Sequence, residues 1–314
     1  MYRYIIRRLL MLIPVLLGAT FLVFFIMNLS PEDPAMIILG ADATPDAVAK
    51  VHAELGLDKP LLIRYAKFIG DLLHGDLGKS YGNNLDVMGQ ILEKLPNTLL
   101  LAFSGVLIAV IVGIPVGILS AKKQYSIFDN VAMVVTLILA ASPAFWFGLV
   151  LVIIFSLNLG WFPSAGMGSG VIGTLVSLVL PSVTLCGSTA ALIARTTRSS
   201  MLEVIRQDYI DTARAKGVRE SKITIHHELK NAMIPIVTVV GLQFGVLLGG
   251  SVMTESVFSW PGVGRFVVDA IKSKNIPCVL GSVVMLSILF TFVNLLVDIL
   301  YAFIDPRIKA QYKR

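Results

Sequence analysis

Few residues in this sequence have the types and spacing that chemistry at a catalytic site requires. Gly78-Lys79-Ser80 matches the end of a phosphate-binding loop, in which a lysine and backbone N–H groups hold nucleotide phosphates. The first glycine of that pattern should lie five residues before the second, where this sequence has Leu73. No strand pattern precedes the segment, so we predict a turn with a solvated lysine rather than a nucleotide site.

The four histidines offer no metal site. His52 and His74 lie apart in the sequence, and His226 and His227 are adjacent. Neighbouring residues on a helix point about 100° apart, so the pair cannot close on one metal ion as residues four apart can. We therefore predict no catalytic residue, no metal ligand and no cofactor bound by this chain. This argues against an enzyme.

One carboxylate stands out because it lies inside an apolar run. Asp298 lies in the segment 278–304, seven residues before Asp305 in the polar end Asp305-Pro306-Arg307. A carboxylate at the centre of a bilayer costs roughly 2.5 to 3.5 kcal/mol on insertion scales. Asp298 is therefore expected to face another helix, either in a structural hydrogen bond or in proton coupling, and the sequence leaves both open.

The composition indicates a membrane protein. Hydrophobic residues make up 56% of the 314 residues and charged residues 15%, against roughly 25% charged in an average soluble domain. Runs of about 20 apolar residues are long enough to cross the hydrocarbon core as helices. We predict an all-α integral membrane protein with six transmembrane helices and a small helical extracytoplasmic segment between the first and second. The expected spans are 9–29, 98–120, 131–157 with a kink or break near Pro143, 171–194, 232–251 and 278–304.

The distribution of charge predicts the sidedness. The first run is longer than the core of a cleaved signal peptide, so we expect it to be retained. With six crossings and a cytoplasmic N-terminus, 17 of the 26 basic residues fall in short cytoplasmic segments, as the positive-inside rule expects. Both termini are then cytoplasmic. The net charge of +6 belongs to the membrane face, and without a base-reading motif we expect no nucleic-acid partner.

The predicted organisation follows from these spans. The regions are an N-terminal transmembrane helix (1–30), an extracytoplasmic helical segment (31–96), a five-helix core (97–304) with a cytoplasmic loop (195–231) and an outer loop (252–277), and a cytoplasmic tail (305–314).

The extracytoplasmic segment carries helix signals. Thr44 and Pro45 indicate a capped helix start and Gly56 its end. A second helix follows Pro60, with an apolar stripe at helical spacing, and a third short helix is expected over 86–95, before Pro96. The stripe consists of Leu62, Tyr65, Phe68, Ile69 and Leu72.

The loop 195–231 holds eight Lys or Arg residues between two apolar runs. Its first half carries an apolar stripe and predicts a helix that stops at Gly217, a residue that tolerates the left-handed turn. Glu220 and Ser221 then start a second helix. The stripe consists of Met201, Leu202, Ile205, Tyr209 and Ala213. A surface membrane anchor would need a broad face of Trp, Phe and Leu, so the narrow stripe and small residues favour docking to another protein.

At these residues the sequence resembles a known family. The run 211–217, DTARAKG, is similar to the E-A-A-x-x-x-G loop of permease subunits in bacterial binding-protein-dependent ABC importers. Five segments resemble the dipeptide, oligopeptide and nickel permease branch. They are the N-terminal run 4–25, GLDKPL at 56–61, GDLG at 75–78, FSWPGVG at 258–264 and DPR at 305–307. Asp211 and Thr212 depart from the broad pattern, which has Glu and Ala there.

The resemblance implies a function and a set of partners. The chain would be half of a translocation pathway in the bacterial cytoplasmic membrane, paired with a second, similar permease, two cytosolic ATPases that use ATP, and an extracytoplasmic binding protein. The coupling residues would be Asp211, Thr212, Ala213, Arg214, Ala215, Lys216 and Gly217. Trp260, Pro261, Gly262 and Arg265 are candidate contacts of the binding protein, the alternative being an interfacial turn anchored by tryptophan.

The substrate is not fixed by the sequence. Within the branch, di- and oligopeptides are the expected cargo, and nickel or a metal chelate is the alternative. Two other function classes are a proton-coupled secondary carrier, for which internal repeats and paired buried charges would be expected, and a membrane-embedded enzyme, for which no catalytic residues are found.

Overall fold

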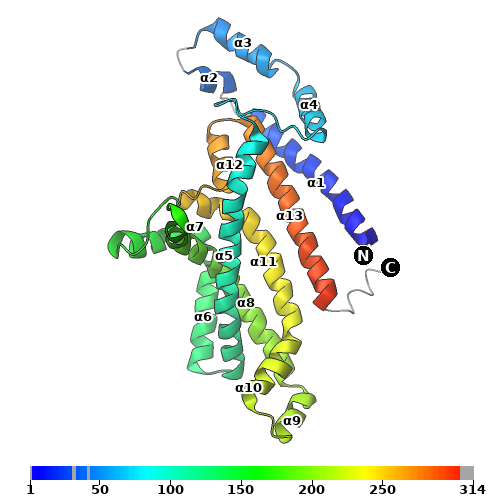
Figure 1. Cartoon of the computed structure of the whole chain (residues 1–314), viewed down its shortest axis with the longest axis vertical. Coiled ribbons are helices and arrows are strands. Elements are labelled where there is room, and N and C mark those ends of the chain that lie inside the picture. Colours follow the sequence, from blue (N-terminus) through cyan, green and yellow to red (C-terminus); the bar gives the residue numbers. More distant parts are fainter. Residues whose placement is uncertain (1, 30–32, 41–42, 305–314) are drawn as a thin grey trace. The chain divides into compact units, whose positions relative to one another are not determined.

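The structure is a computed structural model that describes residues 2–29, 33–40 and 43–304, and its regular elements in these ranges are helices (Figure 1). Five of them are long and apolar enough to cross a membrane, and one bent pair makes a sixth if it counts as one span. The predicted all-α membrane fold is confirmed. The five are α1 (Tyr2–Leu29), α5 (Val87–Lys122), α8 (Gly170–Ile205), α11 (Lys230–Val257) with the helical turns before it, and α13 (Ile276–Ile304).

The bent pair lies where a kink or break was predicted. Helix α6 (Ile127–Ala141) meets α7 (Ala144–Leu151) and the π-helical segment η1 (Val152–Asn158) at an angle of 107°. Ser142 between them is extended, with φ −75° and ψ 130°, because the ring of Pro143 disfavours the helical conformation in the residue before it. The loop that follows η1 leads into α8, as the glycines and the single proline of 158–170 indicate.

The described residues form two compact units, which are treated separately. The first, called here the core unit, contains 99–260 and 292–304, and the second, called the cap unit, contains 2–98 and 261–291. In the core unit, α8 packs against α6, α7 and α11. In the cap unit, segments from both ends of the sequence share one apolar core, which includes Leu77, Val87, Val263 and Val279.

Close contact between α5 and α8 depends on two glycines. A Cβ atom on Gly117 would lie 2.5 Å from the Cβ atom of Thr197 and 2.6 Å from the carbonyl oxygen of Ala194. One turn earlier, a Cβ atom on Gly113 would lie 2.9 Å from the carbonyl oxygen of Ala190. Glycines four apart allow two membrane helices to approach with their backbones nearly in contact.

Helix α8 is longer than predicted. The expected span ended at Ala194, but the helix continues to Ile205. Its last turns are held by packing, since Met201 is buried against Ala121, Ala232 and Ile236. Residues 195–205 therefore extend a membrane helix rather than begin a loop.

Two of the three helices predicted for the segment 31–96 are confirmed in the cap unit. The side chain of Thr44 caps α3 (Pro45–Leu55), and Gly56 ends it in the left-handed conformation with φ 67°. Helix α4 (Leu61–Leu73) follows Pro60. Its predicted stripe is wrong at Leu62, which is 67% exposed, whereas Leu61 packs against the core.

The third predicted helix is wrong in extent. Residues 87–95 are the first turns of α5, which runs through Pro96 without a break to Lys122. Proline is tolerated in such helices because neighbouring groups satisfy the freed carbonyls. Two short helices were not predicted: α2 (Pro34–Leu39), capped by Asp33, and α12 (Val263–Lys272), which lies in the predicted outer loop.

We predict that Gly117→Ala destabilises the protein by about 1 to 3 kcal/mol, because the added methyl group forces α5 and α8 apart. The measurement is unfolding of the purified chain in mixed micelles with increasing SDS. Gly249→Ala on α11 is the matched control, since nothing lies within 4 Å of its added Cβ atom. Equal stability of the two variants would contradict the close contact.

Candidate functional site

The residues 211–217 lie on a short surface helix and the turn that ends it. Helix α9 (Asp208–Ala215) begins after an extended residue, Gln207, and is fixed to the unit by Ile210, which is fully buried. Asp208 and Asp211 lie in its first turn, where negative charge interacts favourably with the helix dipole. The predicted stripe is therefore wrong in two ways: it runs across a break at 206–207, and the buried residue is Ile210 instead of Tyr209.

The turn after α9 has the predicted form. Gly217 adopts φ 74°, which is strained for residues with a side chain. Its N–H group donates to the carbonyl oxygen of Arg214 at 2.9 Å, and that of Val218 donates to the carbonyl oxygen of Ala213 at 3.2 Å. This is the Schellman arrangement of a helix end. The chain then enters α10 (Glu220–Lys222), as predicted for Glu220 and Ser221.

Three ion pairs centre on Arg214. Its guanidinium donates to Glu220 Oε1 at 2.9 Å and to Asp211 Oδ1 at 3.0 Å, and Nη2 lies 3.5 Å from Glu228 Oε1. The hydrogen bond to Glu220 is the main cause that raises the pKa of Arg214, so its charge is kept at any physiological pH. Arg214 thus connects α9 to the segment that leads into α11.

Lys122, the last residue of α5, joins the same cluster. Its ammonium group lies 3.5 Å from Glu220 Oε2 and 3.9 Å from Glu228 Oε2, and it donates to the hydroxyl of Thr224. We call the set of Lys122, Asp211, Arg214, Glu220 and Glu228 the charge cluster. It ties the end of α5 to α9 and to the start of α11.

Glu228 is the buried member of the charge cluster. It is fully inaccessible to solvent and lies in the π-helical segment η2 (Ile223–Leu229) between α10 and α11. A buried carboxylate is stable only when opposite charges compensate for its lost hydration. A π-helical turn inside a helix is rare and is frequently found at functional sites. Arg214 and Lys122 are the charge partners of Glu228 at 3.5 and 3.9 Å, and neither carboxylate oxygen has a hydrogen-bond partner among the described residues.

A second ion pair holds the turn between α5 and α6 to α8. Arg198 Nε donates to Asp129 Oδ1 at 2.6 Å, and Nη2 donates to Oδ2 at 2.7 Å. Asp129 is buried, and it also accepts the N–H group of Tyr125 at 2.9 Å. Such a two-point arginine–carboxylate contact fixes orientation as well as distance.

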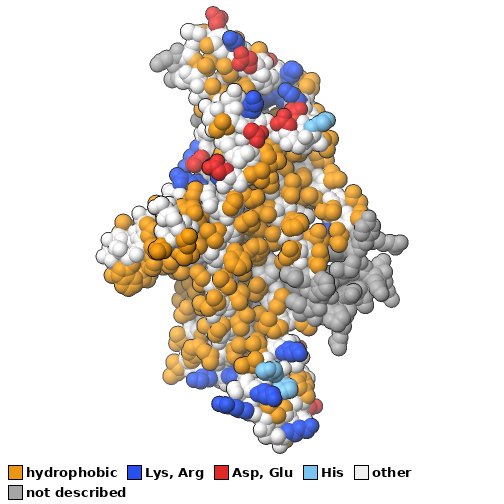
Figure 2. Space-filling view, viewed as in Figure 1, with side chains coloured by type: hydrophobic (Ala, Val, Ile, Leu, Met, Phe, Trp, Pro, Cys, Tyr) orange, Lys and Arg blue, Asp and Glu red, His pale blue; other side chains and the backbone are white. Residues whose placement is uncertain are grey.

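Figure 1 shows α9 and α10 at the end of the core unit where α5 ends and α6 begins. In Figure 2 basic and histidine side chains gather at this end, next to a broad apolar surface over α5 and α6. The apolar surface includes Phe103, Leu107, Ile111, Val131, Val134 and Ile138, all exposed. Lipid would cover such a surface. The seven predicted coupling residues therefore lie beyond the apolar part of the core unit.

The other predicted site residues lie elsewhere. Trp260 is fully buried, and its backbone N–H group donates to the carbonyl oxygen of Glu255 at 2.8 Å. Gly262 is also buried, Pro261 is half-buried, and Arg265 is half-exposed with Nε 3.6 Å from Asp269 Oδ2. Pro261 and Arg265 are the partly accessible members of the four, and contact with a binding protein stays a prediction. Asp298 is half-buried on α13.

Sequence reasoning missed the charge cluster as a unit. In the sequence, Lys122 is only one of the basic residues that indicate which side of the membrane is cytoplasmic, and no role was predicted for Glu228. One signal was present: Glu228 is the single acidic residue between Glu220 and Glu255, in a segment where the other charges are positive. Its partner Lys122 is too distant in sequence for spacing to reveal the pair.

Comparison with known proteins identifies the family of this chain. Residues 113–310 match the family described as "Binding-protein-dependent transport system inner membrane component", and residues 1–102 match the N-terminal family of such components. The chain belongs to this family of multi-pass membrane permease components.

Individual relatives are similar over nearly the whole chain. It is 42% identical to the dipeptide transport system permease protein DppB of Alkalihalophilus pseudofirmus, covering 98% of this chain and 100% of that one. It is 43% identical to the glutathione transport system permease protein GsiC of Pectobacterium atrosepticum, with 98% and 99% covered. The oligopeptide transport system permease protein AppB of Bacillus subtilis is 40% identical, with 98% and 100% covered.

A solved structure shares the fold. An inward-facing form of the MetNI methionine ABC transporter has a chain that matches with a TM-score of 0.57 and 19% identity, covering 69% of this chain and 97% of that one. At this identity the likeness concerns the fold alone.

We predict that Arg214→Gln loosens the segment 208–229, because the charge of Glu228 then has lost one of its two cations. Hydrogen–deuterium exchange of the purified chain should be faster across these residues. Adding Glu228→Gln should restore much of the protection, since it removes the uncompensated charge. The control is the Glu228→Gln single variant. If the increase in exchange rate in the double variant equals the sum of the increases in the Arg214→Gln and Glu228→Gln single variants, the charge cluster does not act as one unit.

Proposed function

We propose that this chain is a permease subunit of an ATP-driven importer of di- and oligopeptides. It forms half of the translocation pathway beside a second, similar permease. The observation that carries the proposal is the exposed helix and turn at 208–217, held by the charge cluster to the ends of membrane helices. Relatives named for dipeptide, glutathione and oligopeptide transport support the peptide class.

The order of helices in the core unit supports a topology of six crossings with both termini in the cytoplasm. Helix α5 runs to the end where α6 begins, α6 returns, and α8 runs back to the same end, where α9 and α10 follow (Figure 1). Counting the bent pair as one span gives this alternation. The basic residues of this end then lie in the cytoplasm, where ATPases are available for docking, and the segment 31–96 lies outside.

The charge cluster provides a route for mechanical coupling. An ATPase that holds α9 displaces Arg214 and its carboxylate partners, and these act directly on the end of α5 and the start of α11. The Asp129–Arg198 pair carries the displacement to the α5–α6 turn and to α8. Rigid motion of packed helices then exposes the pathway to one side of the membrane at a time.

The partners follow from this role. The chain works with two cytosolic ATPases, which bind and hydrolyse ATP, and with an extracytoplasmic binding protein that selects the cargo. The family to which the chain belongs is named for dependence on such a binding protein. A nickel or metal-chelate cargo is the alternative, and ligand analysis of the binding protein distinguishes it from peptides.

Two variants test the docking role. Gly217→Pro cannot adopt φ 74° and loses the N–H group that bonds to Arg214. Ala213→Arg places a long charged side chain at a half-buried position of α9. We expect both to abolish peptide uptake and capture of the ATPases in pull-down, with membrane insertion unchanged.

Gly75→Pro in the cap unit is the matched control. Gly75 has φ 79° and its N–H group bonds to the carbonyl oxygen of Leu72 at 2.9 Å, so the backbone change is the same while ATPase capture should persist. Normal capture by the Gly217→Pro and Ala213→Arg variants would refute the docking assignment.

Asp298→Asn separates ATP-driven transport from proton coupling. We expect reconstituted complexes with this variant to import peptide with ATP and without a pH gradient, because Asp298 then has a structural role. Loss of ATP-driven import together with loss of pH dependence, in correctly folded protein, would instead assign proton transfer to Asp298.

A further inference from the structure

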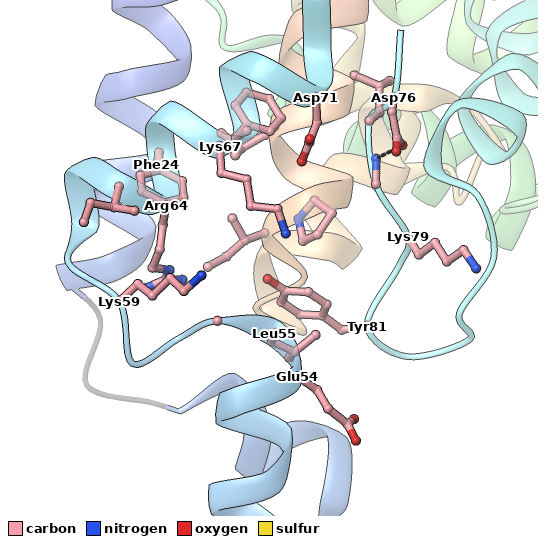
Figure 3. Close-up of a pocket in the computed structure, with 18 of the residues that line it drawn as sticks. Phe24, Glu54, Leu55, Lys59, Arg64, Lys67, Asp71, Asp76, Lys79 and Tyr81 are labelled. Carbon is pink, nitrogen blue, oxygen red and sulfur yellow. Dashed lines mark hydrogen bonds between the residues drawn. The ribbon is translucent and has the colours of Figure 1, made fainter. Parts of the chain in front are cut away.

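The cap unit contains a cavity of about 750 Å³ that the transport role does not use (Figure 3). Its walls come from α1, the end of α3, α4, the loop 76–84 and the start of α13. A volume of this size suits a small ligand or the headgroup of a lipid.

Three cations face this cavity. In Figure 3 Lys59, Arg64 and Lys67 extend into the same space from α4 and the turn before it. Within the described ranges neither Lys59 nor Lys67 forms an ion pair within 4.0 Å. Arg64 donates Nη1 to Asn28 Oδ1 at 2.8 Å and lies over the ring of Phe24, which leaves further N–H donors of the guanidinium for a ligand.

Acidic groups offset these cations only in part. The described residues that line the cavity include three carboxylates, Glu54, Asp71 and Asp76, against four basic residues, Lys59, Arg64, Lys67 and Lys79. Glu54 points away from the cavity (Figure 3), and Asp76 accepts the N–H group of Gly78 at 2.7 Å. On the opposite wall is Tyr81, and burial raises the pKa of its hydroxyl to about 12. The hydroxyl therefore stays protonated and can donate a hydrogen bond to an anion.

Apolar groups continue the cavity wall on one side. Phe24, Ile276 and Leu280 form a buried apolar cluster there. Beside them, α4 exposes Leu62 (67%) and Ile63 (54%), and α1 exposes Leu22 and Phe25. In water this much exposed apolar surface around a basic cavity would be unfavourable.

The start of α4 lies beside the C-terminal end of α1. Arg64 Nη1 donates to Asn28 Oδ1 at 2.8 Å, and Asn28 is one residue before the end of α1 at Leu29. The hydroxyl of Tyr65 reaches further along α1, where it donates to the carbonyl oxygen of Leu17 at 2.8 Å and lies 3.0 Å from Thr20 Oγ1. Amphipathic helices at a membrane surface place lysine and arginine at the phosphates and apolar residues among the acyl chains.

We propose that this cavity binds the phosphate headgroup of an anionic phospholipid from the outer leaflet, an assignment that rests on the proposed topology that puts the segment 31–96 outside. Lys59, Arg64 and Lys67 contact the phosphate, and Tyr81 donates a hydrogen bond to it. The acyl chains lie against Leu62, Ile63 and the exposed face of α1. The bound lipid fixes α4 against α1.

Native mass spectrometry of the delipidated full-length chain with added phosphatidylglycerol tests the proposal. Lys59→Gln/Lys67→Gln should weaken lipid retention by about tenfold, since each basic group near a membrane phosphate contributes modestly but measurably. The matched control, Lys50→Gln/Lys272→Gln, removes the same charge from the cap unit. Lys50 and Lys272 are exposed and do not line the cavity, so retention should be unchanged.

Three further probes identify the ligand. Phosphatidylcholine with the same acyl chains should be retained less than phosphatidylglycerol, and neither inorganic phosphate nor a dipeptide at equal concentration should displace the lipid. Equal retention by the two double variants would overturn the proposal, as would equal binding of the two lipids. Displacement by phosphate alone or by the dipeptide would assign the cavity to a soluble ligand and overturn the lipid assignment.

Discussion

Burial of the Glu228 carboxylate is the constraint on which the arrangement at the proposed cytoplasmic end depends. A charge with no access to water must be accompanied by cations, and these come from two separate segments: Lys122 ends α5, and Arg214 lies on α9. Because the electrostatic cost of separating them is high, the three segments hold one relative position. The helix α9 is thereby presented on the surface without a large apolar face of its own.

The membrane imposes the second constraint. Helices in lipid satisfy their own backbone groups, so association depends on close packing, and the glycines of α5 allow it at α8. The points where regular α-helix is interrupted are informative for the same reason, because the backbone groups freed there need other partners. The chain leaves regular α-helix at Pro143, at η1 and at η2, and the last of these lies at the charge cluster.

Local chemistry made much of the fold predictable from the sequence. The apolar runs predicted the spans, Pro143 the bend, Thr44 and Gly56 the limits of α3, and Gly217 the end of α9. Predictions failed where tertiary contacts decide. Helix α8 continues past Ala194 because Met201 finds a buried position, α5 runs through Pro96, and Trp260 is buried although its turn was expected at the surface. The pairs Lys122–Glu228 and Asp129–Arg198 join distant parts of the chain, and no spacing rule relates such residues.

The central claim is that α9 is the contact for a cytosolic ATPase. The most direct measurement replaces Ala215, an exposed residue of α9, with the photo-crosslinking residue p-benzoylphenylalanine in the assembled transporter. The same replacement at Lys50 in the cap unit is the comparison. The account predicts an adduct with an ATPase subunit from position 215 and none from position 50. An intact complex in which position 215 gives no ATPase adduct, or in which position 50 gives one, would contradict it.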